Sequence, residues 1–154
     1  MWVELAAPAW YIFYVEDKIT MPKEFNSDSF YTFLTEGKFM GTQCNQCSQL
    51  SVEPRMLCPN CHSKDIQWYE FSGTGHLSTF TCISIVPARL EQQGYGRSNP
   101  YCSGVVTLTE GPRISARLSK VDASNPETIK SGMALKIDFN NIDTDSPILT
   151  FCPD

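Results

Sequence analysis

The sequence predicts a mainly β protein in which a short aromatic helix precedes a four-cysteine ribbon and a C-terminal five-stranded barrel. Two Cys-x-x-Cys pairs lie close together in the first half of the chain, and turn-forming residues surround them. From Phe71 onward, alternating apolar and polar residues with many β-branched side chains dominate. A chain of 154 residues is long enough to hold both a small module and a barrel.

The first 25 residues form an extension that is rich in large aromatic side chains and has no clear periodicity. One interpretation is an extra strand or an arm against the protein's own surface. The other is a contact with a partner chain, because large aromatic residues anchor interfaces. Residues 1–25 are therefore treated as a separate N-terminal extension.

A short helix is predicted at residues 26–37, where capping residues open the segment and a glycine closes it. Its apolar side chains recur at i, i+3 and i+4, which places Phe30, Phe33 and Leu34 on one face. A helix this short is unstable unless that face is buried. It can pack on its own protein or dock into a groove of a partner, and both interpretations stay open.

The two cysteine pairs lie within residues 38–70, as Cys44 with Cys47 and, after ten intervening residues, Cys58 with Cys61. A two-residue gap lets both thiolates of a pair face one point, and the second pair completes the tetrahedron that Zn²⁺ prefers. Four thiolates leave no open coordination position, so the predicted zinc is structural. Iron in a rubredoxin-like electron-transfer site is the competing interpretation.

Residues 71–154 are predicted to form the barrel. Five segments have strand character: 71–86, 101–110, 113–121, 133–141 and 148–152. A single helical turn is expected between the third and the fourth segment, where Asn125 and Pro126 precede Gly132. One such insert in an otherwise antiparallel five-stranded set matches the OB barrel better than a sandwich.

No stretch approaches the roughly 18 apolar residues that a membrane-spanning helix needs, and the start lacks the positive charge of a secretory signal. The sequence therefore predicts a cytoplasmic protein with no membrane contact and with reduced cysteines. The three single cysteines, Cys82, Cys102 and Cys152, are expected to be inert buried thiols, since free cysteine packs as a small hydrophobic residue.

The net charge of -5 and the pI of about 5.0 argue against broad nucleic-acid binding, which depends on neutralising phosphates with Lys and Arg. A local exception lies between positions 89 and 121, which hold five basic and two acidic residues. Strand alternation in the third barrel segment puts Arg113 and Arg117 on the same face. Arginine suits phosphate because its planar fork donates two hydrogen bonds at once.

Several further motifs occur in a fixed order along the chain: Phe30-Tyr31, Glu36-Gly37-Lys38, Pro54-Arg55, Cys58-Pro59, Trp68, Ser72-Gly73, Gly75, Phe80-Thr81, Pro100-Tyr101, Glu110-Gly111-Pro112-Arg113 and Gly132-Met133. With both cysteine pairs, they make the chain resemble the zinc-ribbon and OB-fold accessory proteins associated with thiolases, hydroxymethylglutaryl-CoA synthases and enoyl-CoA hydratases. The match runs from about Phe30 to Phe151. The extension before Asn26 and the last residues depart most from the family pattern, and partner choice is expected to differ there.

The resemblance implies an accessory subunit of an acyl-CoA thiolase or a related condensing or hydrating enzyme, with its barrel near the partner's CoA-ester entrance. We expect Arg113 and Arg117 to help hold the phosphates of CoA. The loop at residues 90–100, with Tyr95 and Arg97, is expected to close over the acyl-CoA or over the partner's entrance.

Catalysis by the chain alone is not expected. The sequence has two histidines, and its spacing indicates no Cys-His or Ser-His pair. Two other function classes stay open: a free-standing acyl-CoA or nucleic-acid binding OB module, and an iron electron carrier. Copurification with a large partner separates the accessory subunit from the free-standing module, and metal analysis with a visible spectrum identifies the iron carrier.

Overall fold

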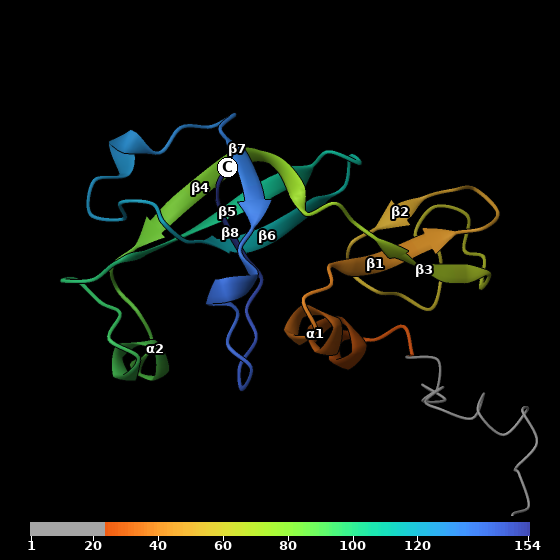
Figure 1. Cartoon of the computed structure of the whole chain (residues 1–154), viewed down its shortest axis with the longest axis horizontal. Helices are drawn as coiled ribbons and strands as arrows, with labels where there is room; N and C mark the ends of the chain where they lie inside the picture. The colour runs from red at the N-terminus through yellow and green to blue at the C-terminus, as the bar shows by residue number, and fades with distance from the viewer. Residues whose placement is uncertain (1–23) are drawn as a thin grey trace, which may run out of the picture.

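The computed structural model describes residues 24–154 and has the predicted mainly β architecture (Figure 1). The helix and the ribbon sheet form one end of the molecule, and the barrel with the C-terminus forms the other. The predictions for the N-terminal extension concern residues that lie almost entirely outside the described range. None of the helices within residues 24–154 combines the length and the apolar character needed to cross a membrane.

Helix α1 spans Ser27–Thr35, as the capping pattern predicts. The Asn26 side chain accepts a hydrogen bond from the backbone N–H of Ser29 at 2.9 Å and so satisfies one of the free donors at the helix start. Gly37 follows the last turn with φ of +76°, a conformation that a glycine adopts without steric cost.

The apolar face of α1 packs on its own protein. Phe30 and Leu34 are buried, and the Phe33 ring centroid lies 5.0 Å from that of Trp68 in an edge-to-face contact. Trp68 also contacts Phe25 at 5.0 Å, so the start of the described chain is held against the ribbon. The open alternative for this helix is thereby resolved in favour of intramolecular packing.

The ribbon contains a three-stranded antiparallel sheet in the order β2-β1-β3. Its strands are β1 at Met40–Cys44, β2 at Leu50–Ser51 and β3 at Ile66–Glu70. Strands this short bury little apolar surface, so the ribbon needs a further source of stability.

The barrel closes in the order β4-β5-β6-β8-β7, and β7 pairs with β4. Only β6 and β8 run parallel among its pairings, and the predicted five-stranded OB-type barrel is confirmed. Its strands are β4 at Thr74–Ile83, β5 at Tyr101–Leu108, β6 at Arg113–Leu118, β7 at Ala134–Ile137 and β8 at Thr150–Pro153. The expected single helical turn is present as the 3-10 segment η2, Pro126–Thr128.

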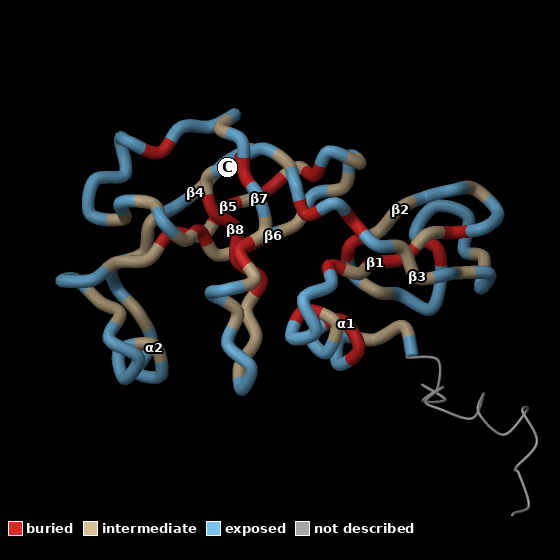
Figure 2. The backbone as a smooth tube through the Cα atoms, in the orientation of Figure 1, coloured by how far each residue is buried: buried red, intermediate tan, exposed pale blue. Residues whose placement is uncertain are grey.

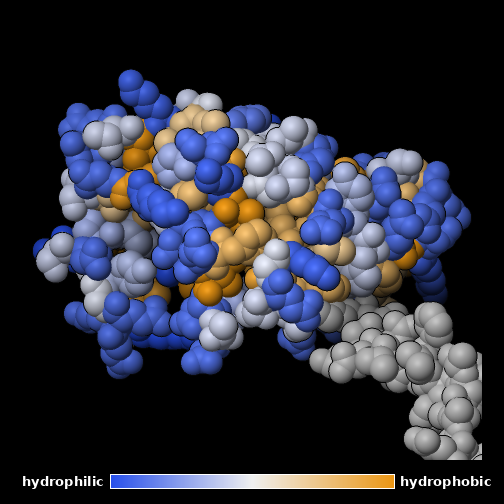
Figure 3. Space-filling view, viewed as in Figure 1, coloured by the Kyte–Doolittle hydropathy of each residue, from blue (hydrophilic) through white to orange (hydrophobic). Residues whose placement is uncertain are grey.

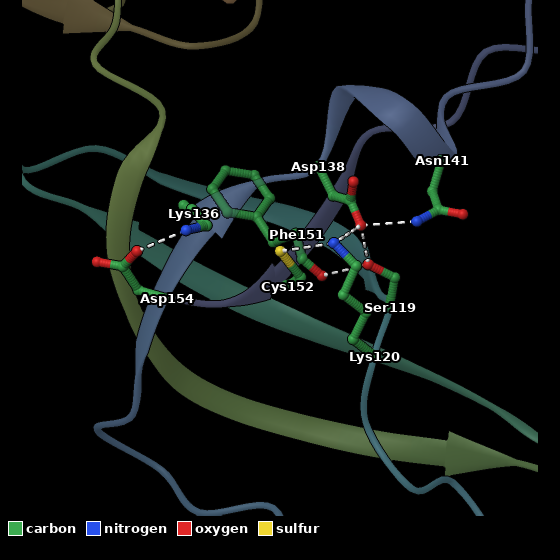
Figure 4. A network of polar contacts seen from close by, with 8 residues as sticks. All are labelled: Ser119, Lys120, Lys136, Asp138, Asn141, Phe151, Cys152 and Asp154. Atoms are coloured by element: carbon green, nitrogen blue, oxygen red, sulfur yellow. Dashed lines mark hydrogen bonds and ion pairs between the residues drawn. The ribbon is translucent and has the colours of Figure 1, made fainter.

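Most strand ends differ from the sequence prediction by one to four residues, and two of these differences have a clear structural cause. The first barrel strand begins three residues late because Gly73, with φ of +73°, bends the chain between β3 and β4. The fourth strand, β7, ends at Ile137 and not at position 141. There Asp138 is buried and binds the Asn141 side chain, which folds Phe139–Asn141 into the 3-10 segment η3 (Figure 4).

One continuous hydrophobic core joins the helix, the ribbon and the barrel (Figure 2). Phe39, which is 2% exposed, lies at the junction. Its ring centroid is 5.5 Å from that of Phe71 and 6.1 Å from that of Phe151 in β8. The ribbon and barrel are therefore packed against each other, and surfaces formed between them have a fixed shape.

The prediction that all three single cysteines are free thiols is wrong for two of them. Cys82 in β4 and Cys102 in β5 are direct partners in the strand register, with Cα atoms 4.0 Å apart, and they form a disulfide. Cys152 is buried and free, as expected. Sequence spacing alone did not reveal the pair because it depends on the register of two strands that are separated by a long connection.

Candidate functional site

The four paired cysteines converge on one point of the ribbon. Their Sγ atoms all lie within 4.8 Å of one another, with 3.5 Å between Cys44 and Cys61 and 3.4 Å between Cys47 and Cys58. A tetrahedral zinc site with Zn–S bonds of about 2.3 Å places its sulfur atoms about 3.8 Å apart, which lies within the observed range. The geometry fits a single four-thiolate metal ion.

Each of the two cysteine pairs lies in its own backbone turn, and the two turns have the same hydrogen-bond pattern. The N–H of Ser48 donates to the carbonyl of Cys44 at 2.9 Å, and the N–H of His62 donates to that of Cys58 at 3.0 Å. Ser48 and His62 both have φ close to +60°, a conformation that usually favours glycine. The strained backbone conformation of each turn thus orients both sulfur atoms of a pair toward the same point.

The surroundings of the cluster shift the pKa values of two of its thiols in opposite directions. Hydrogen bonds from the Gln49 backbone and the Asn60 side chain lower the pKa of Cys47 to about 6. The Ser63 backbone lowers the pKa of Cys61, but burial and the neighbouring sulfur atoms outweigh it and raise that pKa to about 12. A bound divalent cation would favour the deprotonated form of all four thiols, because it stabilises every thiolate of the cluster.

A second site is a groove of about 890 Å³ between the two ends of the molecule. Its walls come from α1, from residues 53–55 of the ribbon, from β5 and β6 of the barrel, and from residues 147–149. Hydrophobic residues also reach the surface near the centre of one face, over the barrel (Figure 3). The groove therefore exists only because the ribbon and the helix pack beside the barrel.

Among the described residues, the charged side chains that line the groove belong to three arginines and one glutamate, although the whole chain is acidic. Arg113 and Arg117 lie on β6, as the alternation predicts, and Arg55 and Glu53 belong to the ribbon. Within residues 24–154, neither Arg113 nor Arg117 has a carboxylate oxygen within 4.0 Å. The groove thus presents positive charge that no described side chain neutralises.

Arg117 is held in position by two aromatic rings. Its guanidinium carbon lies 5.0 Å from the centroid of the Tyr95 ring and 5.3 Å from that of Tyr101. Nη1 of Arg117 also donates to the Tyr95 hydroxyl at 3.3 Å. These contacts fix the guanidinium through π interactions while leaving most of its hydrogen-bond donors free.

The structure brings together some of the residues that the sequence assigned to CoA and leaves one apart. Arg113 and Arg117 share the groove, and Tyr95 contacts Arg117 from the connecting loop. Arg97 is exposed within the tight turn that Gly96 and Asn99 close, and it does not line the groove. That loop also contains an unpredicted helix, α2, at Ala88–Gln92.

Sequence reasoning missed the ribbon's contribution to the groove. Arg55 lies far from Arg113 along the chain, and no local pattern indicates that the two meet. In the sequence, the Pro54-Arg55 motif points only to the family resemblance. Its position beside Cys58, whose metal site fixes the local backbone, was the available signal.

Family comparisons agree with both structural parts. Residues 33–67 match the family model described as the ChsH2 rubredoxin-like zinc ribbon domain, and residues 68–140 match the ChsH2 C-terminal OB-fold domain. Among solved structures, "Ltp2-ChsH2(DUF35) aldolase" has a TM-score of 0.69 at 24% identity, with 85% of this chain and 96% of that chain covered. A DUF35 family protein of unknown function from Sulfolobus solfataricus has a TM-score of 0.57 at 17% identity, with 86% and 90% covered. At these identities the two structures show a shared fold.

Curated relatives include two proteins named DUF35 domain-containing scaffold protein. The one from Pyrococcus furiosus is 32% identical over 105 residues, which cover 68% of this chain and 71% of the relative. The one from Methanothermobacter thermautotrophicus is 25% identical, with 66% and 71% covered. A probable enoyl-CoA hydratase alpha subunit from Thermomonospora curvata is 28% identical, but this chain spans only 32% of its length. The ribbon, the barrel and these relatives together show that the chain belongs to the DUF35 family of ChsH2-type zinc-ribbon and OB-fold proteins.

Proposed function

We propose that this chain is a non-catalytic accessory subunit of an acyl-CoA enzyme, with a thiolase or a related condensing or hydrating enzyme as its partner. Its groove then binds the phosphates of the CoA ester beside the partner's active-site entrance. The observation that carries the proposal is the groove itself, which Arg113 and Arg117 line without a described carboxylate partner.

The names of the relatives support a role in assembly. Two of them are named scaffold proteins, one is named a subunit of a probable enoyl-CoA hydratase, and the matching solved structure is titled an aldolase. Each name belongs to that relative, and the words scaffold and subunit in these names support a role in an assembly. A CoA ester also suits the groove chemically, because it combines several phosphate charges with an apolar acyl end.

The proposal of a non-catalytic role rests on the chemistry of the described residues. The four cysteines would fill the coordination shell of a metal, which leaves no position for an activated water. Within residues 24–154, His62 and His76 are exposed and neither hydrogen-bonds a cysteine or serine side chain. The partner therefore supplies the nucleophile, the base and the oxyanion site.

Reconstitution tests the accessory role. We expect the full zinc-loaded chain to copurify in fixed stoichiometry with an acyl-CoA enzyme, and to raise the turnover of a CoA thioester when it is added back to that enzyme. Turnover of CoA thioesters by the purified chain alone would contradict the proposal. So would a chain that binds single-stranded nucleic acid tightly and assembles with no enzyme.

Simultaneous replacement of Arg113 and Arg117 by alanine is expected to weaken the binding of CoA to the full zinc-loaded chain by more than roughly tenfold, because each arginine contributes charge-assisted hydrogen bonds to phosphate. Isothermal titration calorimetry measures the affinity. Arg89→Ala is the matched control, since Arg89 is exposed, lies outside the groove and, among the described residues, donates a side-chain hydrogen bond to the Ser146 hydroxyl at 3.1 Å.

An Arg97→Ala variant tests the loop assignment separately. Unchanged CoA affinity in the Arg113 and Arg117 double variant would remove those residues from the site. An equal loss in the Arg89 control would show that the binding reflects overall charge and not the groove.

A further inference from the structure

The ribbon contributes a third arginine to the groove, Arg55, and this arginine forms a weak ion pair with Glu53. Nη2 of Arg55 lies 2.7 Å from Oε2 of Glu53, and the two side chains are 55% and 67% exposed. Both residues line the same groove as Arg113 and Arg117. An exposed ion pair between near neighbours in sequence adds little stability, because water and salt screen it.

A phosphate group competes well with Glu53 for this guanidinium. It offers three acceptor oxygens and up to two negative charges, where the carboxylate offers two oxygens and one charge. The chain around Arg55 has two constraints. The ring of Pro54 fixes the φ angle of the residue directly before Arg55, and Cys58 of the metal cluster follows three positions after it. Arg55 is thus a positioned donor whose present partner is weak.

We propose that Arg55 binds an isolated phosphate monoester of the ligand, while Arg113 and Arg117 bind a diphosphate on the barrel side. This inference rests on the proposed function and names the ligand class of the same groove: a nucleotide with two separate phosphate groups. CoA has this pattern, with a diphosphate and a ribose 3′-phosphate. The zinc ribbon is then part of the binding site, and Glu53 occupies Arg55 until the ligand arrives.

The positions of the arginines on the two walls of the groove determine which phosphate group each of them is assigned. Arg113 and Arg117 share one strand face, so two guanidinium groups are available to the same charged group on the barrel wall. Arg55 comes from the ribbon wall as the third cation of the groove. A ligand with one phosphate cluster would be held by the barrel wall alone. A ligand with two clusters can span both walls.

Calorimetry with two ligands and three variants tests this assignment on the full zinc-loaded chain. The ligands are CoA and dephospho-CoA, which lacks the 3′-phosphate. We expect Arg55→Gln to weaken CoA binding roughly tenfold and dephospho-CoA binding less than twofold. We expect Glu53→Gln to strengthen CoA binding by roughly twofold to fivefold, since it removes the competing carboxylate. The double variant should behave like Arg55→Gln.

The opposite signs of the two single variants distinguish ligand binding from a structural role. If the Glu53–Arg55 pair merely stabilised the ribbon, both single variants would weaken binding, and that result overturns the inference. Equal losses of CoA and dephospho-CoA affinity in Arg55→Gln overturn it as well, as does unchanged affinity for CoA. A wild-type chain that binds neither ligand contradicts the proposed function itself. If only the Arg113 and Arg117 double variant loses affinity for CoA, the inference about Arg55 is overturned while the proposed function stands.

Discussion

Removal of the metal by chelation, or replacement of Cys58 by serine, is expected to unfold the ribbon and to lower the stability of the barrel with it. Binding of a structural zinc ion contributes about 10–16 kcal/mol to the folding of zinc-finger peptides at pH 7. The ribbon has only three short strands with which to replace that contribution. Cys58 is 1% exposed, so a serine there also leaves a buried hydroxyl in place of a metal ligand.

The effect reaches the barrel through the shared core. Phe39 lies between α1 and β1, and it packs on Phe71 at the ribbon exit and on Phe151 in β8. When the ribbon unfolds, these rings lose partners and apolar surface is exposed at the base of the barrel. A single cooperative transition at a lower temperature is therefore expected for the Cys58→Ser variant, and not the loss of one domain beside an unchanged barrel.

Metal analysis, calorimetric unfolding and a visible spectrum check this prediction together. The purified chain should contain one zinc ion per molecule and be colourless, and Cys58→Ser should lose the zinc. His62→Asn is the matched control beside Cys61: it replaces an exposed residue at φ of +58° with one that tolerates this conformation, and it should keep the zinc. A folded metal-free chain would contradict the prediction, and a coloured iron-containing protein would establish the electron-carrier alternative.

The sequence predicted well whatever depends on short-range spacing. The cysteine intervals identified the cluster, the cap and glycine identified α1, and strand alternation placed Arg113 and Arg117 on one face. These features depend on residues a few positions apart, where backbone geometry determines the outcome directly. The same local reasoning recovered the five barrel strands, although their ends shifted by a few residues.

Features that depend on long-range packing were missed. The disulfide between Cys82 and Cys102 follows from the register of β4 against β5, and Arg55 reaches the groove only because the ribbon packs beside the barrel. The sequence also assigned Arg97 to the site because it lies in a glycine-containing loop. In the structure that segment forms α2 and a tight turn, and Arg97 is exposed and does not line the groove, so its contact with CoA stays a prediction.

Asp138 provides the second large effect, because it is a buried carboxylate that joins three parts of the barrel (Figure 4). Its side chain is 2% exposed. Oδ2 accepts hydrogen bonds from the Ser119 hydroxyl at 2.7 Å, from the Asn141 amide at 2.7 Å and from the Lys120 ammonium at 3.2 Å. Asp138→Ala should reduce the free energy of unfolding by about 2–4 kcal/mol, since it leaves these donors without their acceptor.

The pH dependence has a definite sign. Burial raises the pKa of Asp138, but the hydrogen bonds from Ser119, Asn141 and Lys120 outweigh it, so the pKa in the folded protein lies below the ordinary 3.8. A carboxylate with a lowered pKa stabilises the fold above its unfolded pKa. That stabilisation is lost as the pH falls through the folded value. The stability difference between wild type and Asp138→Asn should therefore be constant above about pH 5 and shrink below about pH 4.

Denaturant unfolding of both proteins between pH 3 and pH 7 measures this difference, and zinc content is followed in each sample because thiolates also bind protons in acid. Asp154→Asn is the matched control: its partner Lys136 lies 2.9 Å away, but both side chains are about half exposed. Water already screens that pair, so its loss should leave the unfolding midpoint unchanged. The prediction is contradicted if Asp138→Asn and Asp154→Asn lower the free energy of unfolding equally. It is also contradicted if the stability difference between wild type and Asp138→Asn grows as the pH falls. The predicted contrast arises because three donors converge on a carboxylate that water cannot reach.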